Sequence, residues 1–304
     1  MVKMENLIVT SYEYPDLDGA ACTYAYSEFL NKNGNHSIAK LYGKLNEETN
    51  FVLDFFKIKF KHNKMNKNCD FVLVDASDLI HLSKKVESKR VIEIIDHRKV
   101  NQIEKFPNAK IQMEFVGAAA TLVAERFYYN KIAISRESSA LLYSAIISNT
   151  INFHANVTTK RDTKMALWLK ANLHIPKNYI HKMFVHKSTF NSIGSALDDL
   201  GISEMNKKRV GIIQLEIVNL RKFVNSNIKE IEKELRKIKI SQKLDYLFLT
   251  CIDVEKYFNE FVCVDENTKK LLEAALKIRF KNSSATLNRI IMRKEIAPKL
   301  KKLI

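Results

Sequence analysis

Acidic side chains follow three separate apolar runs of this sequence. Asp16 and Asp18 come shortly after the run NLIVTSY, Asp75 ends the run FVLVD, and the run VIEIID leads directly into His97. Carboxylates crowded together repel one another unless a cation neutralises them. If these side chains meet in the fold, a divalent-metal site is the simplest explanation. Oxygen-rich ligands with one imidazole suit Mn²⁺ or Mg²⁺ better than a structural zinc.

A second interpretation applies to each acid taken alone. An Asp that follows a strand commonly caps the next helix, because its carboxylate accepts hydrogen bonds from the first free N–H groups. Asp18 before GAAC, or Asp78 before LIHL, fits that role. The ligand interpretation gains from the whole set, since strongly interacting ionisable groups in one place are typical of functional sites.

These acids need a scaffold that brings distant segments to one edge. Short apolar runs without alternation, as expected of strands covered on both faces, occupy residues 6–12, 37–43, 71–75 and 91–96. Helix-compatible segments lie between them, at 19–34 and 78–89. This alternation predicts an α/β fold with a doubly wound, mainly parallel sheet, whose ligands bind beyond the carboxyl ends of the strands. The three acidic positions are therefore predicted at the same edge.

The rest of the chain predicts a helical layer and then a second, smaller α/β domain. Patterns from Ala118 to about His186 are mostly helical and complete the first domain. Strand signals restart after a weakly patterned stretch, and the helix between them carries an apolar stripe that includes Ile231 and Leu235. The predicted division is a first domain at 1–187, a linker and boundary at 188–208, and a second domain at 209–304.

The composition is that of a globular protein with an excess of basic residues. The 304 residues are 46% hydrophobic, enough for two cores, and the formal net charge is +16. That charge indicates either a polyanionic partner or lysines on solvated faces. The runs KIKFKHNKMNKN and KLKKL alternate with apolar residues and lack an aromatic stacking pattern. They favour the second interpretation and disfavour nucleic acid as a partner, while a small anionic substrate fits either.

Cysteine usage and hydropathy bear on the compartment. The 4 cysteines lie far apart without a C-x-x-C pair, which indicates neither a zinc ribbon nor a disulfide framework and favours a reducing environment. No signal-peptide pattern opens the chain, and no apolar run approaches the length of a membrane span. We expect a cytoplasmic protein that does not bind membranes.

Several segments, in chain order, resemble the DHH phosphoesterases. YPDLDG is similar to the first motif of that superfamily, VLVDASD to the second, IIDHRKV to the DHH motif itself, and LLYSAIISNTINFHANVTTKRD to the fourth. Nearer the C-terminus, IIMRKEIAPKL resembles the Arg-Lys motif of the DHHA2 domain and RVGIIQLEIV its first strand. The branch in question holds manganese-dependent (family II) inorganic pyrophosphatases, exopolyphosphatases and prune-like proteins, with homodimers as a possible assembly.

The resemblance implies roles for individual residues, with one or two Mn²⁺ or Mg²⁺ ions as cofactor. The implied metal ligands are Asp16, Asp18, Asp75, His97 and, through a neutral carbonyl oxygen, Asn149. The implied catalytic residues are Asp75, His97 and Arg98. Phosphate would be bound by Arg98, His154, Arg293 and Lys294, the last two reaching across an interdomain cleft. Two metal ions would share Asp75, while the guanidinium fork and the lysine charge hold the anion.

The sequence departs from the pyrophosphatase pattern at several positions. Tyr12 stands where those enzymes have a histidine, Asn149 where they have an aspartate, and Leu200 or Gly201 where they have a lysine. The loss of one imidazole and one carboxylate is expected to weaken at least one metal position. Tyr12 itself is predicted to be either a packing aromatic or a hydrogen-bond donor to phosphate.

Arg98 is a further departure, since it replaces a second histidine. The Asp-His-Arg version of the motif resembles the prune-like proteins, and a permanent cation there would bind phosphate. The alternative is a surface arginine that pairs with Asp96 or Glu93.

Three functions are compatible with these patterns. The first is a metal-dependent hydrolase of phosphoanhydride or phosphodiester bonds in small anionic substrates such as pyrophosphate, short polyphosphate or nucleotides, acting in the interdomain cleft. The second is a regulatory protein that binds phosphate or nucleotides but has weakened catalysis. The third is a single-stranded nucleic-acid exonuclease, which is disfavoured because the 7 glycines are isolated from one another and form no glycine-rich motif.

Overall fold

The chain folds into two compact units. The computed structural model describes residues 6–60, 69–98 and 102–304. The first unit comprises Met1–Phe153 and Val157–Met183, and the second comprises His154–Asn156 and Phe184–Ile304. Most of the lysine-rich run KIKFKHNKMNKN, which was predicted to be a solvated face, lies outside the described residues, at 61–68.

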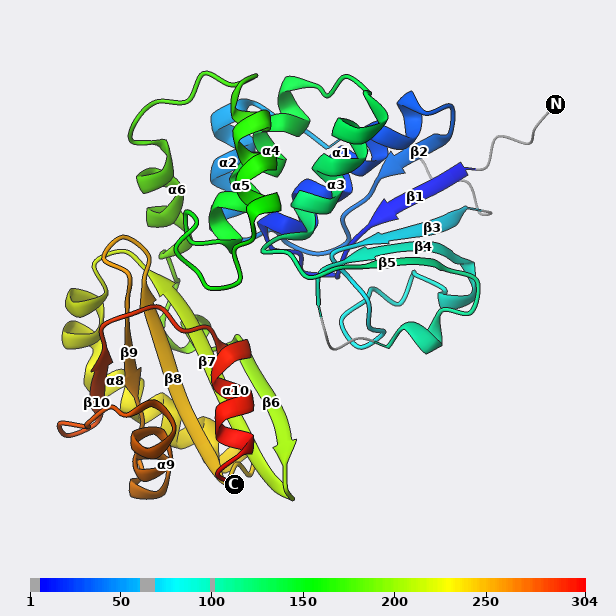
Figure 1. Ribbon diagram of the computed structural model, residues 1–304. Coiled ribbons are helices and arrows are strands. Elements are labelled where there is room, and N and C mark those ends of the chain that lie inside the picture. The colour runs from blue at the N-terminus through cyan, green and yellow to red at the C-terminus, as the bar shows by residue number, and fades with distance from the viewer. Residues whose placement is uncertain (1–5, 61–68, 99–101) are drawn as a thin grey trace. The chain divides into compact units, whose positions relative to one another are not determined.

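A five-stranded parallel sheet forms the centre of the first unit (Figure 1). Its strands, in the spatial order β2-β1-β3-β4-β5, are β2 (His36–Ala39), β1 (Asn6–Thr10), β3 (Asp70–Val74), β4 (Val91–Asp96) and β5 (Lys110–Met113). All four pairings are parallel, which confirms the predicted sheet. β5 was not predicted, because its four residues lie at the sheet edge, are largely exposed and carry no apolar run.

Helices cover one face of this sheet (Figure 1). They are α1 (Leu17–Lys32), α2 (Glu47–Phe56), α3 (Ala119–Asn130), α4 (Arg136–Asn149) and α5 (Lys160–Lys170). α1 contacts β1, β2 and β3 directly, and α4 packs on α1 from outside. α1 is buried along most of its length, since Ala20, Ala21 and Ala25 allow the sheet and α4 to approach it from both sides.

The opposite face of the sheet is covered by connecting segments, and the helix predicted at 78–89 is absent. The chain there forms a loop followed by the 3-10 helix η1 (Ser88–Arg90), and a second one, η2 (Ile103–Lys105), follows β4. Leu82, Val86 and Phe106 from these segments pack into the same apolar cluster as Ile94. The helix prediction was wrong. The Asp78 carboxylate accepts the backbone N–H groups of the residues two and three positions later, as a helix cap does, but the chain does not continue as a helix beyond that turn.

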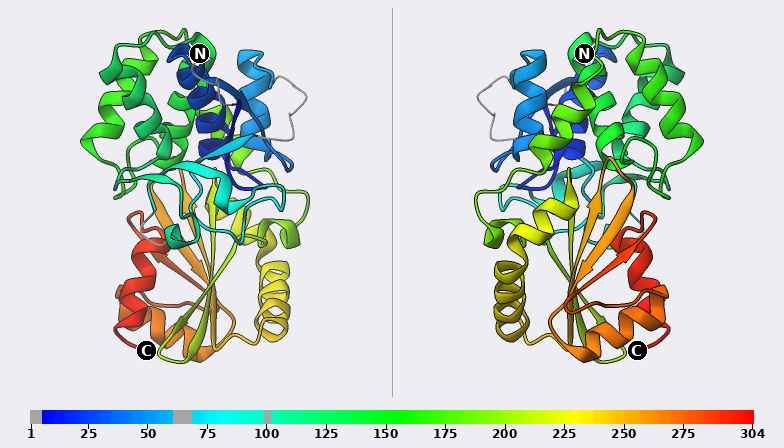
Figure 2. Two further views of the ribbon diagram at one scale, coloured as in Figure 1. Left: turned by 90° about the vertical axis from the view of Figure 1, so that its right-hand side faces the viewer. Right: turned by 90° about the vertical axis from the view of Figure 1, so that its left-hand side faces the viewer.

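The second unit is a five-stranded sheet with helices on both faces (Figure 2). Its strands, in the order β10-β9-β8-β7-β6, are β10 (Ser284–Leu287), β9 (Phe258–Val262), β8 (Tyr246–Asp253), β7 (Lys208–Ile217) and β6 (Leu200–Met205). Only the β7–β8 pairing is parallel. The smaller α/β unit predicted for this part of the chain is confirmed.

The helices of the second unit bury one apolar face each. α8 (Leu220–Ser241) places Ile231 and Leu235 on one face of the sheet, as its stripe predicted, while α9 (Glu266–Leu276) and α10 (Arg293–Lys301) pack on the other. The segment predicted as a linker, 188–208, contains α7 (Ile193–Ala196) and β6, which pairs with β7. The division between the two units falls earlier, within α6 (Tyr179–Lys187). Within the described parts of the chain, no helix is both long and apolar enough to cross a bilayer.

Candidate metal centre

Adjacent strands of the parallel sheet deliver acidic residues to one edge. β1 and β4 both pair with β3, and Asp75 and His97 follow the last residues of β3 and β4. Asp18 lies in the first turn of α1, which follows β1. One ligand atom from each of Asp18, Asp75 and His97 lies within 4.8 Å of the other two. Three segments that are distant in the sequence therefore meet as predicted from the strand ends.

The His97 ring is oriented as a ligand would be. Its Nδ1 lies 2.9 Å from the carbonyl oxygen of Val116, and because a carbonyl can only accept, Nδ1 carries the proton. In the neutral ring, Nε2 then holds a free lone pair. Nε2 lies 3.5 Å from Asp75 Oδ1 and 3.9 Å from Asp18 Oδ2. A carbonyl that fixes the tautomer of a histidine is a common arrangement behind metal-binding imidazoles.

Asp18 is fully buried and saturated with donors. The backbone N–H groups of Ala119 and Ala120, at the start of α3, donate to its two oxygens at 2.8 Å each. The side-chain amide of Asn149 donates to Oδ2 at 2.7 Å. Burial raises the pKa of Asp18 to about 6, with Asp16 adding to the shift and His97 opposing it. The carboxylate is therefore held in place at a cost in solvation, which a nearby cation would offset.

Asp75 adopts a backbone conformation that is uncommon for a residue with a side chain. Its φ of 52° lies in the left-handed region, which typically costs about 1 kcal/mol or more and persists only where the surroundings enforce it. Its N–H donates to the carbonyl of Ile95 at 2.8 Å, and its own carbonyl accepts from Arg98 Nη1 at 3.1 Å. Burial raises the pKa of Asp75 well above its usual range, although Arg98 opposes the shift. This strained turn aims the carboxylate at His97.

Asp96 fixes the Asp-His-Arg segment from behind. It is fully buried, and its Oδ1 accepts the backbone N–H of His97 at 2.7 Å and that of Arg98 at 3.3 Å. Its Oδ2 accepts the hydroxyl of Ser77 at 2.5 Å. Asp96 thus shapes the turn after β4 and does not belong to the group of candidate ligands.

Tyr12 and Arg98 form a second layer beside Asp75. Arg98 Nη2 lies 3.2 Å from Asp75 Oδ1, and the guanidinium carbon lies 4.7 Å from the centre of the Tyr12 ring. The Tyr12 hydroxyl donates to Asp78 at 2.6 Å and accepts the N–H of Ser77 at 3.2 Å. Arg98 therefore pairs with Asp75, which neither interpretation of the sequence named. It also pairs with Asp96, as the alternative interpretation predicted, since its Nη1 lies 3.9 Å from Asp96 Oδ2. Phosphate binding by Arg98 stays a prediction. Tyr12 combines packing with a hydrogen bond to a protein carboxylate.

Two further predicted ligands have other partners in the structure. Asp16 is exposed and caps α1, since its Oδ1 accepts the N–H of Gly19 at 3.0 Å. Asn149 directs its NH₂ group to Asp18, because a carboxylate accepts and does not donate. That Asp16 and Asn149 bind metal stays a prediction, because these hydrogen bonds do not show either residue as a ligand.

The arrangement fits a divalent cation at Asp18, Asp75 and His97. Two buried carboxylates with raised pKa values face the lone pair of an imidazole whose other nitrogen is fixed. Two hard oxygens and one imidazole are a donor set suited to Mn²⁺ or Mg²⁺. The sequence reasoning missed the amides of α3 and the Val116 carbonyl that orient these ligands, because backbone groups leave no signal in residue types.

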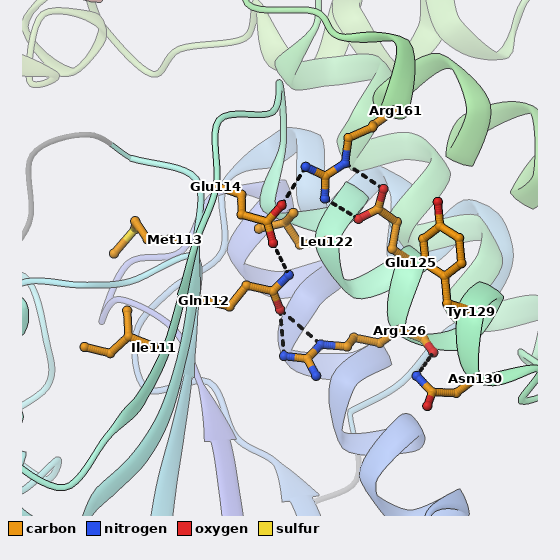
Figure 3. A pocket seen from close by; sticks show the side chains of 10 residues that line it. All are labelled: Ile111, Gln112, Met113, Glu114, Leu122, Glu125, Arg126, Tyr129, Asn130 and Arg161. Carbon is orange, nitrogen blue, oxygen red and sulfur yellow. Dashed lines mark hydrogen bonds and ion pairs between the residues drawn. The ribbon is translucent and has the colours of Figure 1, made fainter.

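A separate cavity along β5 and α3 is lined by charged side chains that pair with one another (Figure 3). Its volume is about 630 Å³. Arg161 binds Glu114 and Glu125, while Arg126 binds Gln112. Asp162, next to Arg161 in the sequence, caps α5 and accepts the N–H of Gly117. The charged side chains of this cavity neutralise one another and present no cluster of like charge to a ligand.

The predicted phosphate-binding residues of the C-terminal part lie in the second unit. Arg293 begins α10, and its Nη1 donates to the carbonyl and carboxylate of Asp199 at 3.1 and 3.2 Å. Lys294 is exposed in the same turn. Gly201, one of the two positions compared with a lysine of the pyrophosphatase pattern, lies directly against the Arg293 guanidinium. The His154 ring stacks on Tyr257 with ring centres 3.6 Å apart. Phosphate binding by these residues stays a prediction.

A parallel sheet with buried carboxylates and one imidazole at its carboxyl edge, joined to a second sheet unit, defines an α/β protein with a candidate divalent-metal centre. Residues 190–303 match the DHHA2 domain family. The chain is 26% identical over 302 residues to a "Probable manganese-dependent inorganic pyrophosphatase" of Clostridium acetobutylicum, covering 96% of each chain. A protein of the same name from Bacillus cereus is 26% identical, with 98% of each chain covered.

A solved structure has the same overall fold. The crystal structure of a Methanococcus jannaschii putative family II inorganic pyrophosphatase matches with a TM-score of 0.79 and 26% identity, over 97% of this chain and 98% of that one. The DHHA2 match in the C-terminal part and the likeness to pyrophosphatases over nearly the whole chain support membership of the DHH superfamily.

Proposed function

We propose that this protein is a metal-dependent hydrolase of phosphoanhydride bonds in small anionic substrates, with Mn²⁺ as its cofactor and pyrophosphate as the first substrate to test. The observation that carries this proposal is the convergence of Asp18, Asp75 and Nε2 of His97 at one buried edge. The names of the relatives over nearly the whole chain support the choice of metal and substrate.

The chemistry divides between the cation and the side chains around it. A bound divalent cation polarises a phosphoryl oxygen and makes the phosphorus more susceptible to attack. Asp18 and Asp75 hold their oxygens in place before any ligand arrives, since both are buried and fixed by donors. Arg98 keeps a permanent positive charge at the same edge of the sheet. Burial lowers the pKa of its guanidinium, but Asp75 and Asp96 raise that pKa above its ordinary value. It is placed to stabilise negative charge on a transferred phosphoryl group.

A weakened, phosphate-binding regulatory protein is the second candidate, and Asn149 is the observation that favours it. The amide donates to Asp18, so this position supplies no negative charge to a cation. Tyr12 likewise directs its hydroxyl to Asp78. A site with fewer charges binds dications less tightly, and turnover falls with occupancy.

The test is phosphate release from pyrophosphate, tripolyphosphate, ATP and a short oligonucleotide, with Mn²⁺, Mg²⁺ or EDTA. We expect metal-dependent hydrolysis of pyrophosphate that is lost in Asp75→Asn and kept in Arg126→His, which removes a cation of the same unit that pairs with Glu93 and not with the candidate metal ligands. Tight pyrophosphate binding without turnover would establish the regulatory alternative. Preferential cleavage of the oligonucleotide would replace the proposal with a nuclease.

Cytoplasmic location and a homodimeric state also stay predictions. The described residues present nothing that contradicts either, and the mass of the protein in solution decides the second. Binding of phosphate by Arg293 and Lys294 is tested by Arg293→Ala and Lys294→Ala, which should raise KM for pyrophosphate and leave Mn²⁺ binding unchanged.

A further inference from the structure

Arg98 occupies the side of Asp75 that faces Tyr12. Its Nη1 donates to the Asp75 carbonyl at 3.1 Å and its Nη2 to Asp75 Oδ1 at 3.2 Å. The same Oδ1 lies 3.5 Å from His97 Nε2. One carboxylate oxygen is thus shared between the candidate metal position and a fixed guanidinium, an arrangement in which a carboxylate bridges two cations.

Among the described neighbours of Arg98, Tyr12 is already engaged with other partners. The Tyr12 hydroxyl is used twice, as donor to Asp78 and as acceptor from Ser77, and burial raises the pKa of the phenol, so it stays protonated. The ring of Tyr12 lies against the guanidinium, 4.7 Å from its carbon. Any cation beside Tyr12 would therefore have to displace a charge that is already bound there.

The positive charge of Arg98 is already paired with two acids of this edge. Its Nη2 lies 3.2 Å from Asp75 Oδ1, and its Nη1 lies 3.9 Å from Asp96 Oδ2. A second dication beside Asp75 would lie close to a guanidinium that cannot lose its proton, and the two positive charges would repel one another.

We propose that this protein binds a single divalent cation, at Asp18, Asp75 and His97, and that the Arg98 guanidinium takes the place of a second cation. The proposal rests on the metal dependence proposed above and not on the choice of substrate. Arg98 is then a permanent positive charge that shares the Asp75 carboxylate with the metal ion. This charge is present whether or not metal is available.

The test is the stoichiometry of Mn²⁺ binding, measured by equilibrium dialysis with elemental analysis, together with the electron paramagnetic resonance spectrum of the bound ion. We expect the full-length wild type to bind one Mn²⁺ per chain with the resolved hyperfine lines of an isolated ion. The variant Tyr12→His with Arg98→His removes the charge and supplies two imidazoles. It should bind two ions per chain and give the broadened spectrum of a coupled pair. Arg126→His, the matched control, should bind one.

Each outcome has a definite meaning. Two ions per wild-type chain, with a coupled spectrum, would overturn the proposal about Arg98 and leave metal-dependent hydrolysis standing. A wild type that binds no Mn²⁺ would overturn both. If the double variant has a native circular dichroism spectrum and still binds one ion, Arg98 is not what excludes the second. Since the wild-type measurement needs no substitution, a variant that fails to fold leaves the proposal testable.

Discussion

Replacing Asn149 by aspartate places a second carboxylate against Asp18 and makes stability depend on metal. In the native protein the amide donates to Asp18 Oδ2 at 2.7 Å. Asn149→Asp removes a hydrogen bond to a charged group, which contributes about 1.5–3 kcal/mol. It also adds repulsion, roughly 4 kcal/mol for unit charges 4 Å apart at an effective dielectric of 20. We expect the metal-free variant to lose about 4 kcal/mol or more at pH 8.

Mn²⁺ should reverse that loss, because the cation converts two repelling carboxylates into two ligands. A hundredfold excess over Kd stabilises any protein by about 2.7 kcal/mol, and the variant gains more since it binds the ion more tightly. The assay is urea unfolding at pH 8 in EDTA and in Mn²⁺. Asn149→Ala is the control, since it loses the hydrogen bond without adding charge. The reasoning is refuted if Asn149→Asp and Asn149→Ala are equally stable in EDTA, or if Mn²⁺ stabilises both equally.

Three other predictions concern single residues. Burial raises the pKa of Asp18 to about 6, so the folded state holds this proton more tightly than the unfolded chain. The contribution of Asp18 to stability in EDTA should therefore be complete below about pH 4, and about 3 kcal/mol of it should be lost as pH rises through 6. Urea unfolding between pH 4 and pH 8 should show a steeper loss of stability in the wild type than in Asp18→Asn, and equal slopes would contradict the assignment. His97→Ala should weaken Mn²⁺ binding at least roughly a hundredfold by calorimetry, with unchanged binding as the contrary result. Gly117→Ala should cost about 1–3 kcal/mol in urea unfolding, because its Cβ would lie 2.6 Å from Thr150 Cγ2, and an unchanged midpoint would show that Thr150 moves freely.

The positions of the acids could be predicted from the sequence, and their hydrogen-bond partners could not. Apolar runs that end at Asp75 and at His97 are enough to put both side chains at the carboxyl edge of a parallel sheet. The direction of each side chain depends on backbone groups, such as the Val116 carbonyl and the left-handed turn at Asp75. Such groups are common to all residues, so the sequence carries no mark of them.

The errors in the fold have local causes. Residues 78–89 have the composition of a helix and a capping aspartate, yet Leu82 and Val86 pack into the apolar cluster of the sheet from a chain that does not continue as a helix. β5 gains its place by pairing with β4 and not by its own apolar content. The sequence predicted the pairing of Arg98 with Asp96, but it did not reveal the shorter contact with Asp75, which is distant in sequence. Pairings of this kind depend on which strands become neighbours.

The start of α3 depends on Asp18 as well. Its N-cap residue, Ala118, has no side chain that accepts a hydrogen bond, and the first free amides of the helix are satisfied by the Asp18 carboxylate instead. A descendant of this protein that abandoned metal altogether would still need that carboxylate to keep α3 in place. Retention of Asp18 in a related sequence is accordingly no sign of metal binding. The residue at the position of His97, whose ring donates to the Val116 carbonyl and satisfies no helix amide, is the better indicator.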